Sequence, residues 1–186
     1  MITDFDMSIL DFIQNHMKCD FLDKVLPPIT HLGDAGALWI FLGLVFLFSV
    51  KTRRMGFQLL ASLALGYLLG NLLLKNVIAR ERPYTINTNI PLLIKEQLDY
   101  SFPSGHTLAS FNGAITIFFY HKKWGIGALV LASLIAFSRM YLYVHFPTDI
   151  LGGLLLAMFV TFTIRGLFDR FVPKTIRFRR QYGNNT

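Results

Sequence analysis

Three short stretches of the chain carry side chains suited to phosphate chemistry. Lys75–Pro83 reads K-x6-R-P, Pro103–His106 reads P-S-G-H, and Ser138–Asp149 reads S-R-x5-H-x3-D. Together they supply three cations, two histidines and a carboxylate. Such a set can grip a phosphate, attack its phosphorus and protonate the oxygen that leaves. We therefore expect one site for phosphate chemistry, built from all three stretches.

The first stretch places two cations at the end of a hydrophobic run. Lys75 and Arg82 are seven residues apart, or two helical turns, so both would point the same way if the helix continued that far. Pro83 favours an extended conformation at Arg82, which predicts that the helix ends about there. An ammonium and a guanidinium are a common pair for holding phosphate oxygens. The alternative is that both side chains extend to the lipid headgroups.

The second stretch opens a helix. Ser104 can cap that helix, Gly105 lets a phosphate approach the backbone, and the free N–H groups of the first turn face an anion. His106 is placed to donate a proton to a leaving oxygen. The alternative is an ordinary capped helix with an interfacial histidine.

The third stretch is the most specific. Arg139 lies inside an apolar run, where a charge is costly and indicates a partner. Pro147 fits the first turn of the next helix, with Asp149 just inside it. Asp149 can accept a hydrogen bond from one ring nitrogen of His145, which leaves the other nitrogen free as a base or nucleophile. The alternative for Asp149 is a carboxylate favoured by the helix dipole.

The elements that must position these residues are predicted to cross a membrane. The composition is 53% apolar, and the apolar residues gather in five runs of about the 17–25 residues that span a bilayer. This predicts an all-α integral membrane protein with a bundle of five transmembrane helices. The first and third runs are short and need flanking residues. The runs are Ala35–Val50, Gly56–Ala79, Gly105–Tyr120, Trp124–Tyr143 and Ile150–Phe168.

The N-terminal residues read differently from these runs. Phe5, Ile9 and Phe12 recur at helical spacing among acidic residues, which is typical of an amphipathic helix in the membrane interface. A second amphipathic piece is expected to end at Pro27-Pro28 and Gly33, and Asp34 is expected to cap the first span. A sixth, weakly hydrophobic span here stays open. We divide the chain into an interfacial segment (1–33), a transmembrane phosphatase domain (34–171) and a basic tail (172–186).

Charge predicts the orientation. The net charge of +7 is compatible with nucleic acid as a partner. The positive residues, however, are concentrated in particular loops, which favours a membrane topology and no nucleic acid. By the positive-inside rule the basic face is cytoplasmic, and the three stretches meet at the extracytoplasmic face. The basic residues are Lys51, Arg53 and Arg54 after the first span, Lys122 and Lys123 after the third, and Lys174, Arg177, Arg179 and Arg180 in the tail.

With all three stretches in place, the chain resembles the membrane-bound type 2 phosphatidic acid phosphatase superfamily over about Thr30–Phe171. The resemblance implies a helical bundle with a phosphatase site that needs no metal and no cofactor. It implies that His145 attacks phosphorus and forms a phosphohistidine, with Asp149 as its partner, and that His106 protonates the leaving group. The residues that it implies hold the phosphoryl oxygens are Lys75, Arg82, Ser104, Gly105 and Arg139.

The chain departs from parts of this family. Many members begin with a strongly hydrophobic extra span, which is replaced here by the amphipathic segment. One undecaprenyl-diphosphatase branch has aspartate where this chain has Gly105 and lacks the lysine found here as Lys75. The chain looks more like the phosphatidylglycerophosphatase and general lipid-phosphatase branch. Members of that branch also act on undecaprenyl diphosphate, so both substrate classes stay open.

Three functions compete at this stage. The first is hydrolysis of a lipid phosphate or diphosphate at the outer leaflet. The second is transfer of the phosphoryl group to an acceptor other than water, which the same residues would serve. The third is a non-catalytic binder of lipid phosphate, which the intact His106, His145 and Asp149 disfavour because binding needs cations but no nucleophile. The sequence gives no indication of the oligomeric state.

Overall fold

A computed structural model describes residues 2–171, and these residues form helices and loops without a β-strand. The predicted all-α fold is therefore confirmed for this part of the chain. A 3-10 turn, η1 (Asp34–Gly36), joins α2 to α3, and a π-helical segment, η2 (Tyr67–Leu74), joins α4 to α5. The helices are α1 (Ile2–His16), α2 (Asp20–His31), α3 (Ala37–Leu47), α4 (Arg53–Gly66), α5 (Lys75–Ile78), α6 (Pro83–Ile86), α7 (Gly105–Tyr120), α8 (Lys122–Tyr141) and α9 (Pro147–Phe171).

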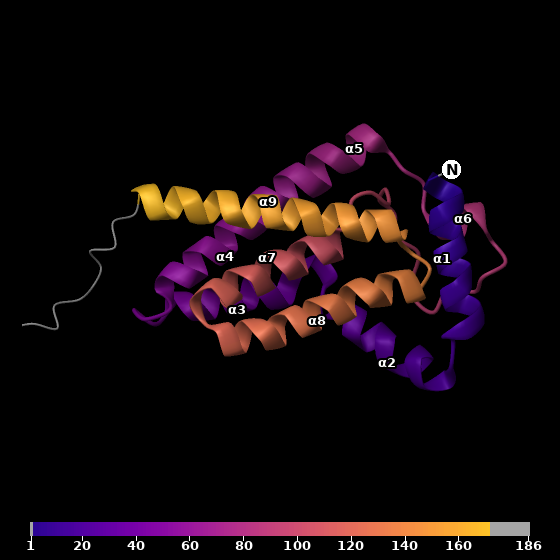
Figure 1. Cartoon of the computed structure of the whole chain (residues 1–186), viewed down its shortest axis with the longest axis horizontal. Coiled ribbons are helices and arrows are strands. Elements are labelled where there is room, and N and C mark those ends of the chain that lie inside the picture. Colours follow the sequence, from indigo (N-terminus) through magenta and orange to yellow (C-terminus); the bar gives the residue numbers. More distant parts are fainter. Residues whose placement is uncertain (1, 172–186) are drawn as a thin grey trace, which may run out of the picture.

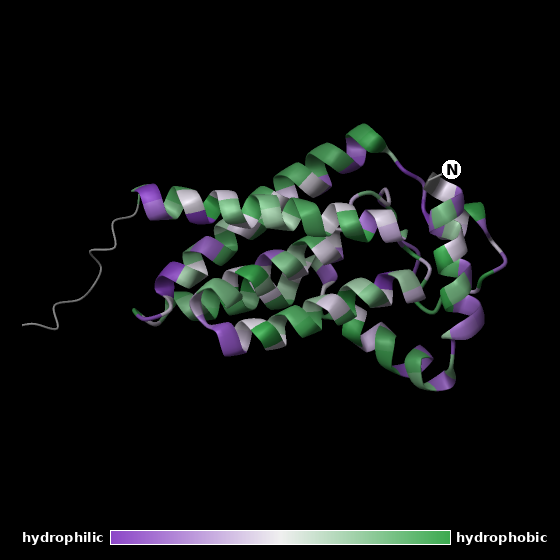
Figure 2. Cartoon of the chain, in the orientation of Figure 1, coloured by the Kyte–Doolittle hydropathy of each residue, from purple (hydrophilic) through white to green (hydrophobic). Residues whose placement is uncertain are grey.

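The long helices lie side by side in a bundle, with α7 packed against α4, α8 and α9 (Figure 1). Hydrophobic residues cover the lengths of these helices, and polar residues gather at the two ends of the bundle (Figure 2). Large apolar side chains such as Phe41, Val130 and Phe159 are exposed on the outside. A lipid environment explains this exposure, because it is the solvent in which an apolar surface is stable. The chain is a membrane protein.

Three segments are long and apolar enough to cross a membrane, namely Arg53–Ile86, Lys122–Tyr141 and Pro147–Phe171. The helices α2 and α3 pass the same test as a pair bent by 42°, which gives a fourth. Helix α7 has only 16 residues, or about 24 Å at a rise of 1.5 Å per residue, which is shorter than a bilayer core of about 30 Å. Residues 2–171 thus support three or four spans, and the count of five or six stays a prediction.

Of the two breaks predicted before α3, the one at Gly33 is confirmed and the one at Pro27-Pro28 is wrong. Helix α2 continues through Pro27-Pro28 to His31. Each proline removes only one backbone hydrogen bond, and the buried Leu26 and Thr30 hold the helix on the bundle on either side of the pair. The chain turns instead at η1, where Ala35 and Gly36 have φ of 50° and 67°.

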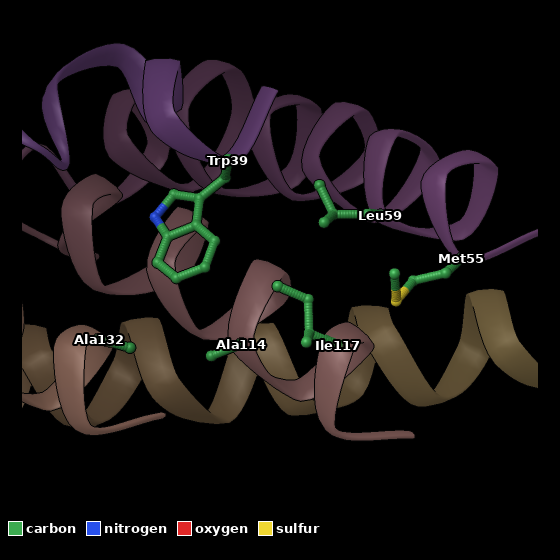
Figure 3. Close-up of a cluster of buried hydrophobic side chains, with 6 residues drawn as sticks. All are labelled: Trp39, Met55, Leu59, Ala114, Ile117 and Ala132. Atoms are coloured by element: carbon green, nitrogen blue, oxygen red, sulfur yellow. The ribbon is translucent and has the colours of Figure 1, made fainter. Parts of the chain in front are cut away.

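A tryptophan organises the core of the bundle (Figure 3). The Trp39 ring of α3 is buried and donates from Nε1 to Ser110 Oγ at 3.2 Å. Gly113 of α7 makes room for this ring, since a Cβ there would lie 2.1 Å from Trp39 Cε3. The cluster consists of Trp39, Met55, Leu59, Ala114, Ile117 and Ala132.

The two ends of the bundle differ in composition. The end of α5, the start of α7 and the α8–α9 turn lie at one end, on the right in Figure 1. The α3–α4 and α7–α8 connections, with the basic residues named above, lie at the other end. Helices α1 and α2 bury Leu10, Ile13 and Leu26 against the bundle beside the first end. An interfacial role for residues 1–33 stays a prediction, and the tail 172–186 lies outside the described residues.

Candidate active site

Two cations of the first stretch converge on a single loop carboxylate. The Lys75 ammonium bonds Asp99, and Arg82 Nη2 donates to Asp99 Oδ1 at 2.6 Å. The helix ends at Ile78, four residues before Arg82, because Ala79 adopts a left-handed conformation (φ 47°). Lys75 and Arg82 therefore meet through this loop contact and not through the helical register.

The charge state of Asp99 follows from these contacts. Burial opposes ionisation of Asp99, but the hydrogen bonds and charges of Lys75 and Arg82 outweigh it and lower the pKa of Asp99 to about 2. Asp99 is therefore ionised at neutral pH, and both cations face an anion supplied by the chain. The sequence analysis did not single out Asp99, which follows the first stretch in a loop without periodicity.

Arg139 supplies the third cation from the last turn of α8. Its side chain is buried, and Nη1 donates to Thr30 Oγ1 at 2.8 Å. Its Nε and Nη2 have no hydrogen-bond partner among the described residues. Buried donors without partners are costly, so these two N–H groups are suited to the oxygens of an anion.

The second stretch opens α7 as predicted. Ser104 is the N-cap, and its Oγ accepts from the backbone N–H of Thr107 at 3.4 Å and from the Thr107 hydroxyl at 3.0 Å. Gly105 lies against Asn71 of η2, whose Nδ2 would be 3.2 Å from a Cβ at this position. Gly105 lines the cavity described below, whereas Ser104 does not. A direct contact between the Ser104 hydroxyl and phosphate stays a prediction.

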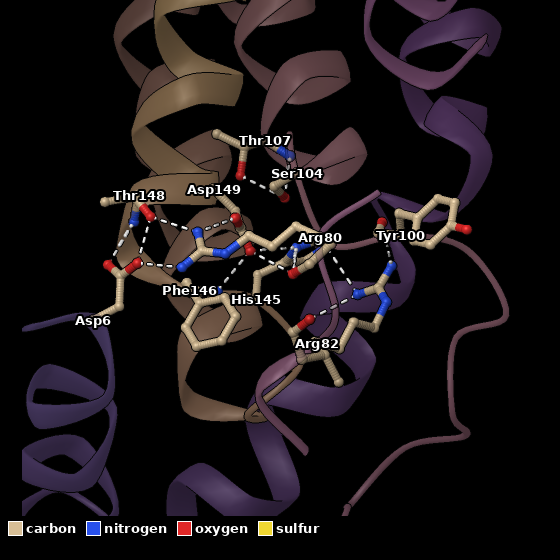
Figure 4. A network of polar contacts seen from close by, with 12 residues as sticks. Asp6, Arg80, Arg82, Tyr100, Ser104, Thr107, His145, Phe146, Thr148 and Asp149 are labelled. Carbon is tan, nitrogen blue, oxygen red and sulfur yellow. Dashed lines mark hydrogen bonds and ion pairs between the residues drawn. The ribbon is translucent and has the colours of Figure 1, made fainter. Parts of the chain in front are cut away.

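His145 lies in the turn between α8 and α9 (Figure 4). Tyr143 has φ of 60°, and the backbone N–H groups of Val144 and His145 both bond the Arg139 carbonyl, which fixes this turn on the end of α8. Burial, together with the charges of Arg82, Arg139 and Lys75, holds the pKa of His145 well below its usual range. The imidazole is therefore neutral at neutral pH.

Asp149 lies next to the His145 ring. His145 lines the cavity described below, with Nδ1 3.4 Å from Asp149 Oδ2 and Nε2 3.3 Å from Arg82 Nη1. Asp149 Oδ2 also accepts from Ser101 Oγ at 2.5 Å and from the Phe146 N–H at 2.8 Å. The predicted pairing of Asp149 with one ring nitrogen of His145 is thus present, with the other nitrogen beside Arg82.

Arg80, which lies outside the predicted set, reaches the same carboxylate. Arg80 Nη1 donates to Asp149 Oδ1 at 2.7 Å, and Arg80 Nη2 donates to Asp6 Oδ2 at 2.6 Å (Figure 4). Asp6, on α1, is fully buried and also accepts from the backbone N–H and hydroxyl of Thr148. The Arg80 guanidinium lies 3.9 Å from the centre of the Phe146 ring. Helix α1 is thereby connected to the His145–Asp149 pair.

His106, on the opposite wall, also has an aspartate partner. His106 Nε2 is 2.8 Å from Asp34 Oδ1. The sequence predicted that Asp34 caps the first span, and this prediction is wrong. The N-cap of η1 is Gly33, and that of α3 is Gly36, without a side-chain hydrogen bond in either case. The strained turn directs the Asp34 carboxylate toward α7 and His31 instead.

These residues border a cavity of about 900 Å³. One end carries the three cations together with His106 and His145. The other runs between α3 and α4 along Ile40, Leu60, Leu63 and Tyr67. The polar end is lined by Asp34, Asn71, Lys75, Arg82, Asp99, Gly105, His106, Arg139 and His145. Within residues 2–171 no group of three or more His, Cys, Asp or Glu side chains is arranged to hold a metal ion.

Residues 55–172 match the family described as the PAP2 superfamily, and this stretch is more than half of the chain. The chain belongs to the PAP2 superfamily. The resemblance inferred from the three stretches is confirmed, and this PAP2 protein is a phosphatase.

Its relatives include two named lipid phosphatases. Phosphatidylglycerophosphatase B of Bacillus subtilis is 35% identical over 175 residues, which is 87% of this chain and 80% of that protein. An undecaprenyl-diphosphatase of Sulfolobus acidocaldarius is 35% identical over 126 residues, which is 67% of this chain. The match spans 61% of the Sulfolobus protein, less than two thirds of its length.

Solved structures agree with the fold of the PAP2 chain. The crystal structure of a transmembrane PAP2-type phosphatidylglycerolphosphate phosphatase from Bacillus subtilis superimposes with a TM-score of 0.74 at 32% identity. The match covers 96% of this chain and 89% of that one. LpxE of Aquifex aeolicus shares the fold, with a TM-score of 0.72 at 24% identity over 86% of this chain and 94% of that chain.

Proposed function

We propose that this PAP2 protein hydrolyses a lipid phosphate or lipid diphosphate at the extracytoplasmic face of a membrane, through a phosphohistidine and without a metal. Phosphatidic acid, phosphatidylglycerophosphate and undecaprenyl diphosphate represent the substrate class. The substrates named for the relatives above support this class.

In the first step, the lone pair of His145 Nε2 attacks phosphorus. Asp149 accepts from Nδ1–H and stabilises the positive charge that develops on the ring. The bond between phosphorus and the leaving oxygen breaks, and His106 donates a proton to that oxygen. Lys75, Arg82 and Arg139 stabilise the negative charge on the remaining phosphoryl oxygens.

In the second step, water attacks the phosphohistidine. His106, now neutral, takes a proton from this water, and the bond between phosphorus and Nε2 breaks to release inorganic phosphate. Both histidines then return to their starting states. The same chemistry with an alcohol in place of water would make the protein a phosphotransferase.

The observation that carries this proposal is the two-part cavity. Arg139 lines its polar end and carries two buried N–H groups that have no partner among the described residues, which suits a phosphate. Leu60, Leu63 and Tyr67 continue the cavity along a membrane-spanning helix, which suits an apolar chain attached to that phosphate. A soluble phosphate ester would have no use for this second part.

The test is phosphate release by the purified protein in detergent, with water as the only acceptor. Phosphatidic acid, phosphatidylglycerophosphate and undecaprenyl diphosphate are compared under the same conditions. We expect release from at least one of them and an acid-quenched phosphohistidine that His145→Gln abolishes. His121→Gln is the matched control, because His121 follows the last turn of α7 at the other end of the bundle.

Two results would contradict the proposal. The first is a lack of phosphate release from all three lipids by a folded protein. The second is undiminished turnover by His145→Gln. Release that requires an added alcohol would assign the transferase function in place of hydrolysis.

A further inference from the structure

The carboxylate of Asp34 contacts a proposed catalytic residue, yet it has no role in the proposed steps. It lies on the turn between α2 and α3, far in sequence from the three stretches, yet it lines the same cavity. Its Oδ1 is 2.8 Å from His106 Nε2, and its Oδ2 is 2.7 Å from His31 Nδ1.

The backbone around Asp34 is shaped to make this contact. A Cβ at Gly33 would lie 2.8 Å from His106 Cδ2, so only glycine lets the turn approach the ring this closely. Ala35 follows with φ of 50°, a left-handed conformation that is unfavourable for a residue with a Cβ. A strained turn that places a carboxylate against a histidine in a cavity indicates a functional constraint.

The contact also decides which nitrogen of His106 can act. Because Nε2 is engaged by Asp34, Nδ1 is the nitrogen available to a leaving oxygen. Burial of His106 opposes an imidazolium, and the charges of Arg139 and Lys75 oppose it as well. Asp34 is the carboxylate that opposes them, and its other oxygen contacts the exposed His31.

We propose that Asp34 is the positioning residue of the general acid, which holds His106 through Nε2 and supplies a negative charge that favours its protonated form for proton transfer from Nδ1. This inference rests on the proposed function. The site then contains two His–Asp pairs with opposite tasks. Asp149 orients the nucleophile, and Asp34 maintains the acid.

The test compares Asp34→Asn with wild type on two leaving groups. A lipid alkoxide needs a proton as it leaves, whereas p-nitrophenolate needs little. We expect kcat for phosphatidic acid to fall by about 10- to 100-fold and kcat for p-nitrophenyl phosphate to fall by less than about 3-fold. The descending limb of the phosphatidic acid kcat–pH profile is expected to move to lower pH by about 1–2 units, and Asp34→Glu to restore it in part. Asp20→Asn, an exposed carboxylate at the far end of α2, is the control.

Further measurements separate a positioning role from a structural one. In a His106→Ala background, Asp34→Asn should cause no additional loss. In protein labelled with 15N at its histidine rings, the His106 titration should move to lower pH in Asp34→Asn and stay in place in Asp20→Asn. An equal loss on both substrates with unmoved profiles would make Asp34 merely structural and overturn the inference, even with phosphohistidine formation intact. An inactive wild type would instead overturn the proposed function, and the acid role with it.

Discussion

Replacement of Arg80 tests whether helix α1 is tied to the catalytic pair. Asp6 and Asp149 are both fully buried, and both accept from the Arg80 guanidinium. Arg80→Ala leaves two buried carboxylates without their shared cation. Removal of one member of a buried ion pair costs about 3–5 kcal/mol. The other donors to each carboxylate remain, so we expect the lower part of this range.

The loss should appear as a lower melting temperature in detergent. About 3 kcal/mol corresponds to a decrease of about 6–12 °C for a chain of this size. Phosphate release should also fall, because Asp149 loses a donor that holds its carboxylate beside His145. The double variant with Asp6→Asn should lose less than the sum of the two single variants, by about 1–3 kcal/mol.

The matched control is Arg165→Ala. Arg165 lies at the opposite end of α9, where its Nε is 3.7 Å from Asp169 Oδ2 and both side chains are partly exposed. Such a pair contributes less than about 1 kcal/mol. If Arg80→Ala melts at the same temperature as Arg165→Ala, the Arg80 ion pairs do not contribute measurably to stability, and the predicted connection of α1 to the catalytic pair is wrong.

Three more predictions concern acid, metal and packing. The ion pairs of Asp99 contribute stability above pH 4 that is lost as the pH falls toward its folded pKa of about 2. Melting temperatures followed by circular dichroism should therefore decrease between pH 4 and pH 2. In Asp99→Asn, the melting temperature should depend less on pH in this range. Phosphate release should persist in excess EDTA, because the proposed steps use only cations of the chain, and activity that returns only on addition of Mg²⁺ or Zn²⁺ would contradict this. Gly113→Ala should destabilise the protein by about 1–3 kcal/mol, because its Cβ would meet Trp39 at 2.1 Å. Gly127→Ala, with nothing within 4 Å, should be neutral or slightly stabilising, and equal melting of the two variants would argue against this packing.

Local sequence signals were sufficient for most of the long helices and for the meeting of the three stretches at one cavity. The run Gly105–Tyr120 coincides with α7 because the Ser104 cap and the apolar run both mark it locally. Pro147 begins α9 as its fixed φ predicts. The convergence of the three stretches followed from counting spans, since the ends of antiparallel neighbours fall at alternate faces.

The acidic partners could not be predicted in the same way. Asp6, Asp34 and Asp99 each bond a residue at least 24 positions away in sequence, and no periodicity records such a contact. Asp34 also carried a misleading local signal, because aspartate before an apolar run is a common N-cap. Arg80 was not among the predicted site residues. Its partners, Asp6 and Asp149, are brought together only by the folded bundle.

The loop carboxylate of Asp99 has a consequence for selection among anionic lipids. It already neutralises one of the charges of Lys75 and Arg82, so under the proposed function a headgroup phosphate at these cations competes with a carboxylate that is in place. A phosphodiester lipid brings a single negative charge, and the exchange gains it no net attraction. A phosphomonoester carries roughly 1.5 to 2 negative charges near pH 7. It therefore neutralises Lys75 and Arg82 more completely than the single charge of Asp99 does. Under the proposed function, charge alone would therefore favour the rarer phosphomonoester headgroup over the phosphodiesters that make up most of a bilayer, before any recognition of shape.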